Sequence, residues 1–291
     1  MARLDRIGAV AREIAQIGAV LGREFSYELI ETVAQRPAPA LCAGLAQLDD
    51  AGLLFCRGLA PQSSYRFKHA LVQDAAYGTL LRARRRELHA RVAAVLERDF
   101  VDLVERQPEL LAHHLTAAGD TERAVDQWLK AGRLAADRQT HVEAIAHLQR
   151  GLSLLAIQPE TPERDAREIE LQLALGSSSV VAVGNDSQEV TDAYRRACEL
   201  AERLGDDRQL FEALFGSWAN NQGAGRVRAA LADLPRLSGV ADRVNDDGPR
   251  LQAHHAAWTT LRSTGALIDA LRHTELGRAL YDPERHRSHR L

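Results

Sequence analysis

From about residue 107 onward, the sequence repeats one local pattern, in which helical segments alternate with short turns. Apolar residues recur at helical spacing, and glycines such as Gly119, Gly205 and Gly265 mark the turns between them. The β-branched run at 179–183 is interpreted as a loop or a helix end. Because a single helical hairpin cannot bury its apolar face alone, a series of hairpins must stack, and the sequence predicts an α-solenoid.

Part of the tetratricopeptide pattern occurs in these hairpins. The pattern places W-x₂-L-G-x₂-Y on one helix and A-x₃-F on the next, over about 34 residues. Trp128, Gly132 and Ala135 fit the first helix, while Ala144 and Leu148 fit the second. Small residues at Gly132 and Ala144 predict a close approach of two antiparallel helices. Weaker copies centre on Trp218 and Ala229 in helices 207–221 and 225–241, and on Trp258 and Ala270 in helices 250–263 and 266–281.

The first hundred residues follow a different pattern, which predicts a winged helix. It begins with three predicted helices: one with an apolar stripe that ends at Gly22, one capped by Ser26 and one that begins at Pro37 or Pro39. Two β-type runs, 53–56 and 65–67, then predict a small hairpin, and helices around 69–81 and 83–98 follow. The predicted stripe consists of Leu4, Ile7, Val10, Ile14, Ile17 and Leu21.

The predicted fold class is therefore mainly α, with a winged-helix domain and its small β-hairpin followed by a TPR-like α-solenoid. We place the winged-helix domain at 1–100 and the helical repeats at 101–291. The final helix, 266–281, carries Leu267, Ile268 and Leu271, which the preceding helix cannot cover completely. We therefore expect the repeat array to be truncated at the C-terminus and its last helix to promote self-association.

Composition predicts a cytoplasmic globular protein. The 291 residues are 45% hydrophobic and carry a formal net charge of −3, so neither disorder nor a polyanionic partner is indicated. No apolar run approaches the ~20 residues of a membrane span, and no membrane partner is expected. The three cysteines, Cys42, Cys56 and Cys198, lie too far apart in sequence to suggest a disulfide framework or a CxxC metal site.

Catalytic and cofactor motifs are absent from the sequence. It contains no G-x₄-G-K-[ST], H-E-x-x-H, G-x-S-x-G or G-x-G-x-x-G. Adjacent histidines, His113-His114 and His254-His255, point to different faces of a helix, and His286 and His289 lie three apart. We expect inter-helix or solvated histidines and no metal site, no cofactor and no catalytic residue. An enzyme with an unrecognised site is the weakest interpretation.

A DNA-binding winged-helix transcriptional regulator is the alternative function. Arg82 and Arg84–Arg86 form the densest basic run and could contact phosphates. The predicted recognition helix, 37–51, is rich in Ala and Leu and ends in Asp49-Asp50, which would repel phosphate. We therefore expect protein partners rather than nucleic acid.

Several segments resemble one family, the STAND-type signalling ATPases. Segment 65–77, YRFKHALVQDAAY, with Leu80-Leu81, Arg84–Arg86 and Leu88-His89 after it, resembles their winged-helix segment. Segments 107–114, QPELLAHH, and 144–151, AIAHLQRG, resemble their tetratricopeptide region, and 280–286, LYDPERH, fits the same region. The likeness is greatest to bacterial members that carry a class III adenylate/guanylate cyclase domain.

The resemblance implies a non-catalytic regulatory and protein-interaction module, a fragment of a signalling ATPase–adenylate cyclase protein. The P-loop and cyclase motifs of that family are missing here, so no enzyme activity is expected of this chain. The resemblance also implies one candidate cofactor-binding residue, His69, which would contact a nucleotide phosphate when a P-loop ATPase domain is present. The expected partners are proteins bound by the helical repeats, among them an ATPase domain.

Overall fold

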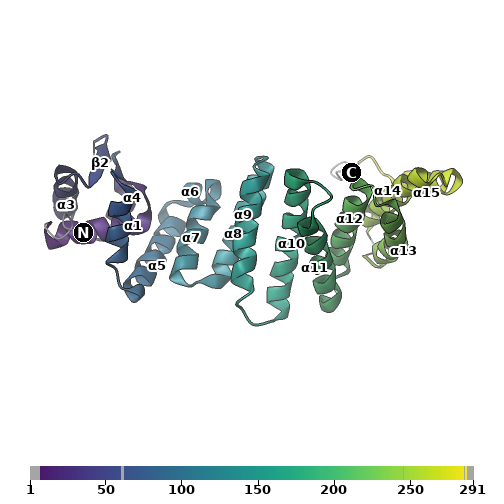
Figure 1. Ribbon diagram of the computed structural model, residues 1–291, viewed down its shortest axis with the longest axis horizontal. Coiled ribbons are helices and arrows are strands. Elements are labelled where there is room, and N and C mark those ends of the chain that lie inside the picture. Colours follow the sequence, from purple (N-terminus) through teal and green to yellow (C-terminus); the bar gives the residue numbers. More distant parts are fainter. Residues whose placement is uncertain (1–6, 60–61, 245, 285, 287–291) are drawn as a thin grey trace. The chain divides into compact units, whose positions relative to one another are not determined.

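The computed structural model describes residues 7–59, 62–244, 246–284 and 286. Within these residues lie fifteen helices and three strands, so the described chain is mainly α, as predicted (Figure 1). Contacts divide the chain into two compact units, Met1–Gln127 and Trp128–Leu291. None of the described helices is both long enough and apolar enough to cross a membrane.

The first unit combines helices with one small sheet. Its elements are α1 (Ala9–Leu21), β1 (Glu24–Ser26), α2 (Tyr27–Ala34), α3 (Ala38–Asp50), β2 (Leu54–Arg57), β3 (Ser64–Phe67), α4 (Ala70–Gly78), α5 (Arg82–Asp99), α6 (Val101–Arg106), α7 (Pro108–Ala118) and the start of α8 (Thr121–Asp137). The helix starts predicted at Ser26 and Pro37 are confirmed. Ser26 Oγ accepts a hydrogen bond from the Leu29 amide at 3.2 Å, and Pro37 immediately precedes α3.

The sheet contains the predicted hairpin and one strand that the sequence did not predict. Strand β3 lies between β1 and β2 and is antiparallel to both, with Tyr65 opposite Phe25 and Cys56. Phe25 is buried and stacks on Tyr65 with 6.0 Å between ring centroids. The three-residue strand β1 is too short to show an alternating pattern, and only its pairing with β3 defines it.

One prediction for the buried face of α1 is wrong. Val10 is 40% exposed, whereas Ile14 and Ile17 are buried. The helix begins only at Ala9, so Val10 lies in its first turn, and the contact with Gly44 of α3 is made by Ala11 and Ile14. Leu4, the first residue of the predicted stripe, lies outside the described residues.

The second unit is a series of helical hairpins. After the end of α8 come α9 (His141–Leu155), α10 (Pro162–Val183), α11 (Gln188–Leu204), α12 (Asp207–Gly223), α13 (Val227–Val244), α14 (Asp247–Thr264) and α15 (Leu267–Leu280). Each helix from α9 onward packs on the next, and α10 also contacts α12, which contacts α14 (Figure 1). Contacts between alternate helices are typical of a TPR-like array, in which the first helices of successive hairpins line one face. Residues 179–183 form the end of α10, one of the two predicted outcomes.

The close approach predicted at Gly132 is confirmed. A Cβ atom at Gly132 would come within 2.6 Å of the Leu148 side chain, so only glycine allows α8 and α9 to pack as they do. Ala144 and Leu148 are both fully buried. The first predicted repeat therefore has the correct register.

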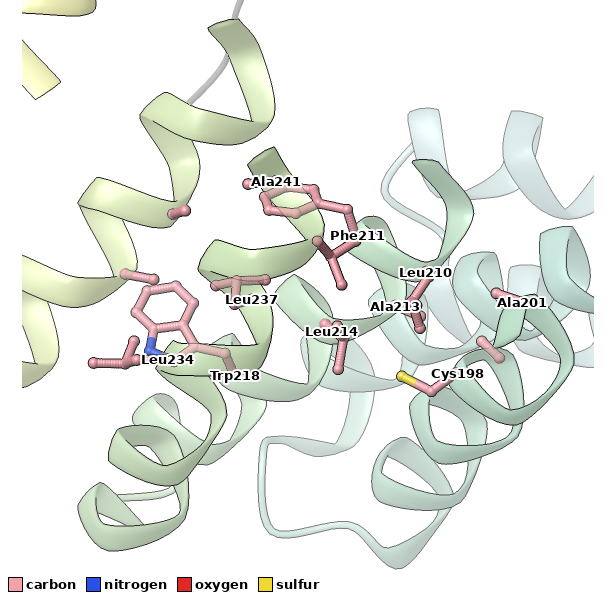
Figure 2. Close-up of a cluster of buried hydrophobic side chains, with 14 of the residues drawn as sticks. Cys198, Ala201, Leu210, Phe211, Ala213, Leu214, Trp218, Leu234, Leu237 and Ala241 are labelled. Carbon is pink, nitrogen blue, oxygen red and sulfur yellow. The ribbon is translucent and has the colours of Figure 1, made fainter. Parts of the chain in front are cut away.

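A continuous apolar core joins α10 to α14 (Figure 2). Phe211, Leu214 and Trp218 of α12 and Leu237 of α13 all lie in this cluster, and Figure 2 shows them between neighbouring helices. The indole Nε1 of Trp218 donates a hydrogen bond to Thr260 Oγ1 at 2.9 Å. The predicted centre at Ala229 is wrong by one residue, because Ala230 is buried and Ala229 is exposed.

Candidate functional site

His69 lies at the start of a helix, as predicted. It is the residue immediately before α4, has extended backbone angles and an exposed side chain, and its side chain makes no capping hydrogen bond. Lys68 is also exposed, and its Nζ lies 5.2 Å from the centre of the Phe55 ring. His69 and Lys68 are thus exposed neighbours in the chain just before α4, and the phosphate-binding role of His69 stays a prediction.

The arginine run of α5 makes structural contacts within the first unit. Arg84 pairs with Glu87 at 2.6 Å, and Arg85 lies over the Tyr77 ring at 4.6 Å. The Arg86 side chain donates a hydrogen bond to the carbonyl of Ala118, the last residue of α7, at 3.2 Å. These contacts direct three of the four guanidinium groups toward the protein and leave fewer of them to bind phosphate.

Two of the histidines in the first unit form a buried pair. His89 of α5 and His114 of α7 are each 1% exposed, and their Nδ1 atoms lie 2.9 Å apart. Tyr77 Oη lies 3.0 Å from His89 Nε2, and the His113 ring packs edge-on against His89. Burial, with a smaller effect of His113, lowers the pKa of His89 to about 4. Burial, His89 and His113 lower the pKa of His114 to about 3.

The second unit contains a similar histidine pair. His254 of α14 and His273 of α15 have their Nδ1 atoms 3.0 Å apart. His255 packs edge-on against both Trp218 and Trp258. The His254–His273 and His255–Trp218 contacts join two helices each, which is one of the two outcomes expected for these histidines. The described residues contain no group of three His, Cys, Asp or Glu side chains arranged for a metal ion. His289 lies outside the described residues.

One cavity of the second unit lies between the first helices of three successive hairpins, α8, α10 and α12. Its volume is about 360 Å³, and we refer to it as the α8–α10–α12 pocket. Leu173, Ala136 and Ala174 form apolar parts of its wall. Its other lining residues are Gly132, Arg133, Asp137, Glu170, Ser177, Ser178, Gln209 and Glu212.

A smaller cavity of about 180 Å³ adjoins the pocket along the same face. It lies between α12 and the start of α14, and Glu212 lines both cavities. Arg208 and Asp246 line the smaller one and form an ion pair at 2.9 Å. The first helices α8, α10, α12 and α14 therefore share one hollowed face, which polar and charged side chains line in part.

Sequence reasoning did not find Ser178, Gln209 or Glu212, because no local motif contains them. The one sequence feature that could have grouped these pocket residues was the spacing of the repeat. Positions about 34 to 47 residues apart in a helical-hairpin array lie on the same face, so Arg133, Glu170 and Gln209 could have been grouped by their spacing.

No family model matches the chain. An uncharacterized protein of Rhizobium meliloti is 26% identical over 286 residues, which cover 97% of this chain and 27% of that protein. The chain thus spans about a quarter of the length of this relative.

The solved structure is a Signal Transduction ATPase with Numerous Domains protein with a tetratricopeptide repeat sensor, from Pyrococcus horikoshii. It is 12% identical, with a TM-score of 0.45, and the match covers 98% of this chain and 46% of that chain.

Proposed function

We propose that this chain is a non-catalytic, regulatory protein-interaction module whose partner binds along the face formed by α8, α10, α12 and α14. The observation that carries this proposal is the α8–α10–α12 pocket, which three hairpins build together. Helical-hairpin arrays use extended faces of this kind to bind other proteins.

The proposed origin of the chain in a STAND-type signalling ATPase with a cyclase domain rests on a resemblance. The residues that carry it are those of segments 65–77, 107–114 and 144–151. In this proposal, residues 1–100 form the winged-helix domain, residues 101–291 form the repeat region, and the parent protein supplies the ATPase. His69, exposed at the start of α4, would contact the phosphate of a nucleotide bound to that ATPase domain. The chain would act in the cytoplasm and bind proteins rather than DNA.

The test is site-specific photo-cross-linking with the full chain in an extract of the organism that expresses it. A photoreactive amino acid is placed at Ser177, an exposed residue of α10 that lines the pocket, or at Ser153 of α9 as a matched control. Both serines are exposed, and both hydroxyls bond to a carbonyl of their own helix. We expect a discrete protein adduct from Ser177 and none from Ser153. Equal adducts from both positions, or none from Ser177, would contradict the proposal.

DNA binding is tested in parallel. Fluorescence anisotropy with a duplex of random sequence is followed as the salt concentration rises. A DNA-binding protein loses affinity steeply with salt, because it displaces counterions from the phosphates. We expect no salt-dependent binding, and a steep loss of affinity would support the transcriptional regulator instead.

A further inference from the structure

The polar groups of the α8–α10–α12 pocket include acceptors that nothing in the described chain satisfies. Oε1 of Gln209 is buried and accepts no hydrogen bond. Ser178 is only 2% exposed and lines the pocket, and its hydroxyl makes no hydrogen bond to a described residue. Buried polar groups in folded proteins normally have partners, so the Ser178 hydroxyl at the wall of the pocket is suited to a ligand that supplies one.

Charge in the pocket is also unbalanced, with three carboxylates and one guanidinium. Arg133 pairs with Glu170 at 2.9 Å. Neither Asp137 nor Glu212 forms an ion pair or accepts a hydrogen bond from any residue that the structure describes. The nearby Arg208 is held by Asp246 at 2.9 Å, outside the pocket. Glu212 therefore has no ion-pair partner among the described residues, and the charges of Arg208 and Arg133 act on it from farther away.

The titration of Glu212 agrees with this geometry. Burial, together with the charges of Asp206 and Glu170, raises the pKa of Glu212 above its usual value, although Arg208 and Arg133 act in the opposite direction.

The size and the wall of the pocket indicate what kind of cation fits. Its volume of about 360 Å³ is near the lower end of the range of about 300–1,000 Å³ for small-ligand sites. Leu173 and Ala174 offer an apolar surface beside the carboxylates. Lysine and arginine side chains have this combination, an apolar stem that ends in a charged donor group.

We propose that the α8–α10–α12 pocket binds the lysine or arginine side chain of a partner polypeptide, with Glu212 and Asp137 accepting hydrogen bonds from its cationic head. This inference rests on the proposed interaction function and assigns the chemistry of the partner. The stem of the bound side chain lies along Leu173 and Ala174, and the Ser178 hydroxyl contributes a further polar contact.

The experiment is an NMR titration of the full chain with three pentapeptides. They are acetyl-Gly-Gly-Lys-Gly-Gly-amide and the two analogues with norleucine or glutamate in place of the lysine. We expect only the lysine peptide to shift the side-chain amide signals of Gln209 and the backbone signals of Ser178 and Glu212. A norleucine or glutamate peptide that shifts the same signals with equal affinity would overturn the inference.

Two matched variants locate the binding. Glu212→Gln removes the pocket charge, and Glu275→Gln makes the same change at an exposed position of α15. Loss of a charged hydrogen bond should weaken binding of the lysine peptide by about tenfold in Glu212→Gln, and Glu275→Gln should leave it unchanged. Equal affinity in wild-type protein and Glu212→Gln would overturn the inference.

A third titration, with the free diamine cadaverine, separates a peptide side chain from a small cation. If cadaverine binds more weakly than the lysine peptide, the result supports a partner polypeptide as the source of the cation. If it binds equally or more tightly, the partner polypeptide is overturned as the source. If the lysine peptide fails while Ser177 still cross-links to a protein, the pocket chemistry is wrong and the interaction function stands. If the Ser177 adduct is also missing, the interaction function fails as well.

Discussion

His89 and His114 share a hydrogen bond between their Nδ1 atoms, 2.9 Å apart, in the buried contact of α5 with α7. One ring must donate and the other must accept, so the bond requires at least one neutral imidazole. Tyr77 faces the other nitrogen of His89, and the ring of His113 also packs against His89. No carboxylate of the described residues forms an ion pair with either ring, so a proton added to the pair would be a buried charge without an anionic partner.

This pair predicts acid sensitivity of the first unit. The pKa is lowered from the ordinary value of 6.5 to about 4 for His89 and to about 3 for His114. At a pH below about 6.5, the folded state therefore binds fewer protons than the unfolded state. The stability of the first unit should be constant above about pH 7 and should fall as the pH drops from about 6.5 toward 4. Hydrogen–deuterium exchange of the α5 and α7 peptides measures this change.

The control for the acid prediction is a variant of the pair itself. His114→Gln cannot titrate, so it should reduce the slope of α5 and α7 protection against pH, at some cost in stability at pH 7. His255→Gln, in the second unit, should leave that slope unchanged. The same slope in wild-type protein and in His114→Gln would show that the pair does not control it.

The packing of α8 on α9 predicts the effects of two substitutions. Ala144→Leu inserts a larger side chain at a fully buried position and should cost about 1–3 kcal/mol of unfolding free energy. Leu148→Ala leaves a cavity next to Gly132 and should cost about 2–5 kcal/mol. Denaturant unfolding followed by tryptophan fluorescence measures both changes, because Trp128 lies in this hairpin. Unchanged unfolding midpoints in both variants would contradict the repeat register.

These hairpins could be predicted because small and large residues alternate at helical spacing where two helices touch. Gly132, Ala144 and Leu148 show the pattern within twenty residues. The α8–α10–α12 pocket could not be predicted in that way, since Ser178 and Glu212 belong to different hairpins and only the stacking of hairpins brings them together. The contact of His114 with its buried partner could not be predicted either, because His89 lies 25 residues earlier in the sequence.

The exposed apolar side chains of α15 predict self-association. Leu267, Ile268 and Leu271 are 63%, 86% and 59% exposed, in agreement with the expectation that α14 covers this helix only in part. Contiguous apolar surface of this kind favours association. Light scattering should show a mass that rises with protein concentration, and Ile268→Lys with Leu271→Glu should abolish the rise. A constant monomer mass for the wild-type chain at all concentrations would contradict this prediction.

The interaction function also predicts that the isolated chain turns over no nucleotide. Its sequence contains no P-loop, so neither ATP hydrolysis nor formation of a cyclic nucleotide is expected. Product formation is measured after successive purification steps. Turnover that persists through purification and disappears when one residue of this chain is changed would show that an unrecognised active site exists.

The central claim is that a protein partner binds across α8, α10 and α12, and blocking the pocket tests it most directly. Ala174→Trp places a large side chain in the wall of the pocket, and Ala229→Trp places the same side chain at an exposed position of α13 as the control. The measurement is the yield of the protein adduct from the photoreactive group at position 177. We predict that Ala174→Trp abolishes the adduct while Ala229→Trp retains it. An equal yield from both variants would contradict the account.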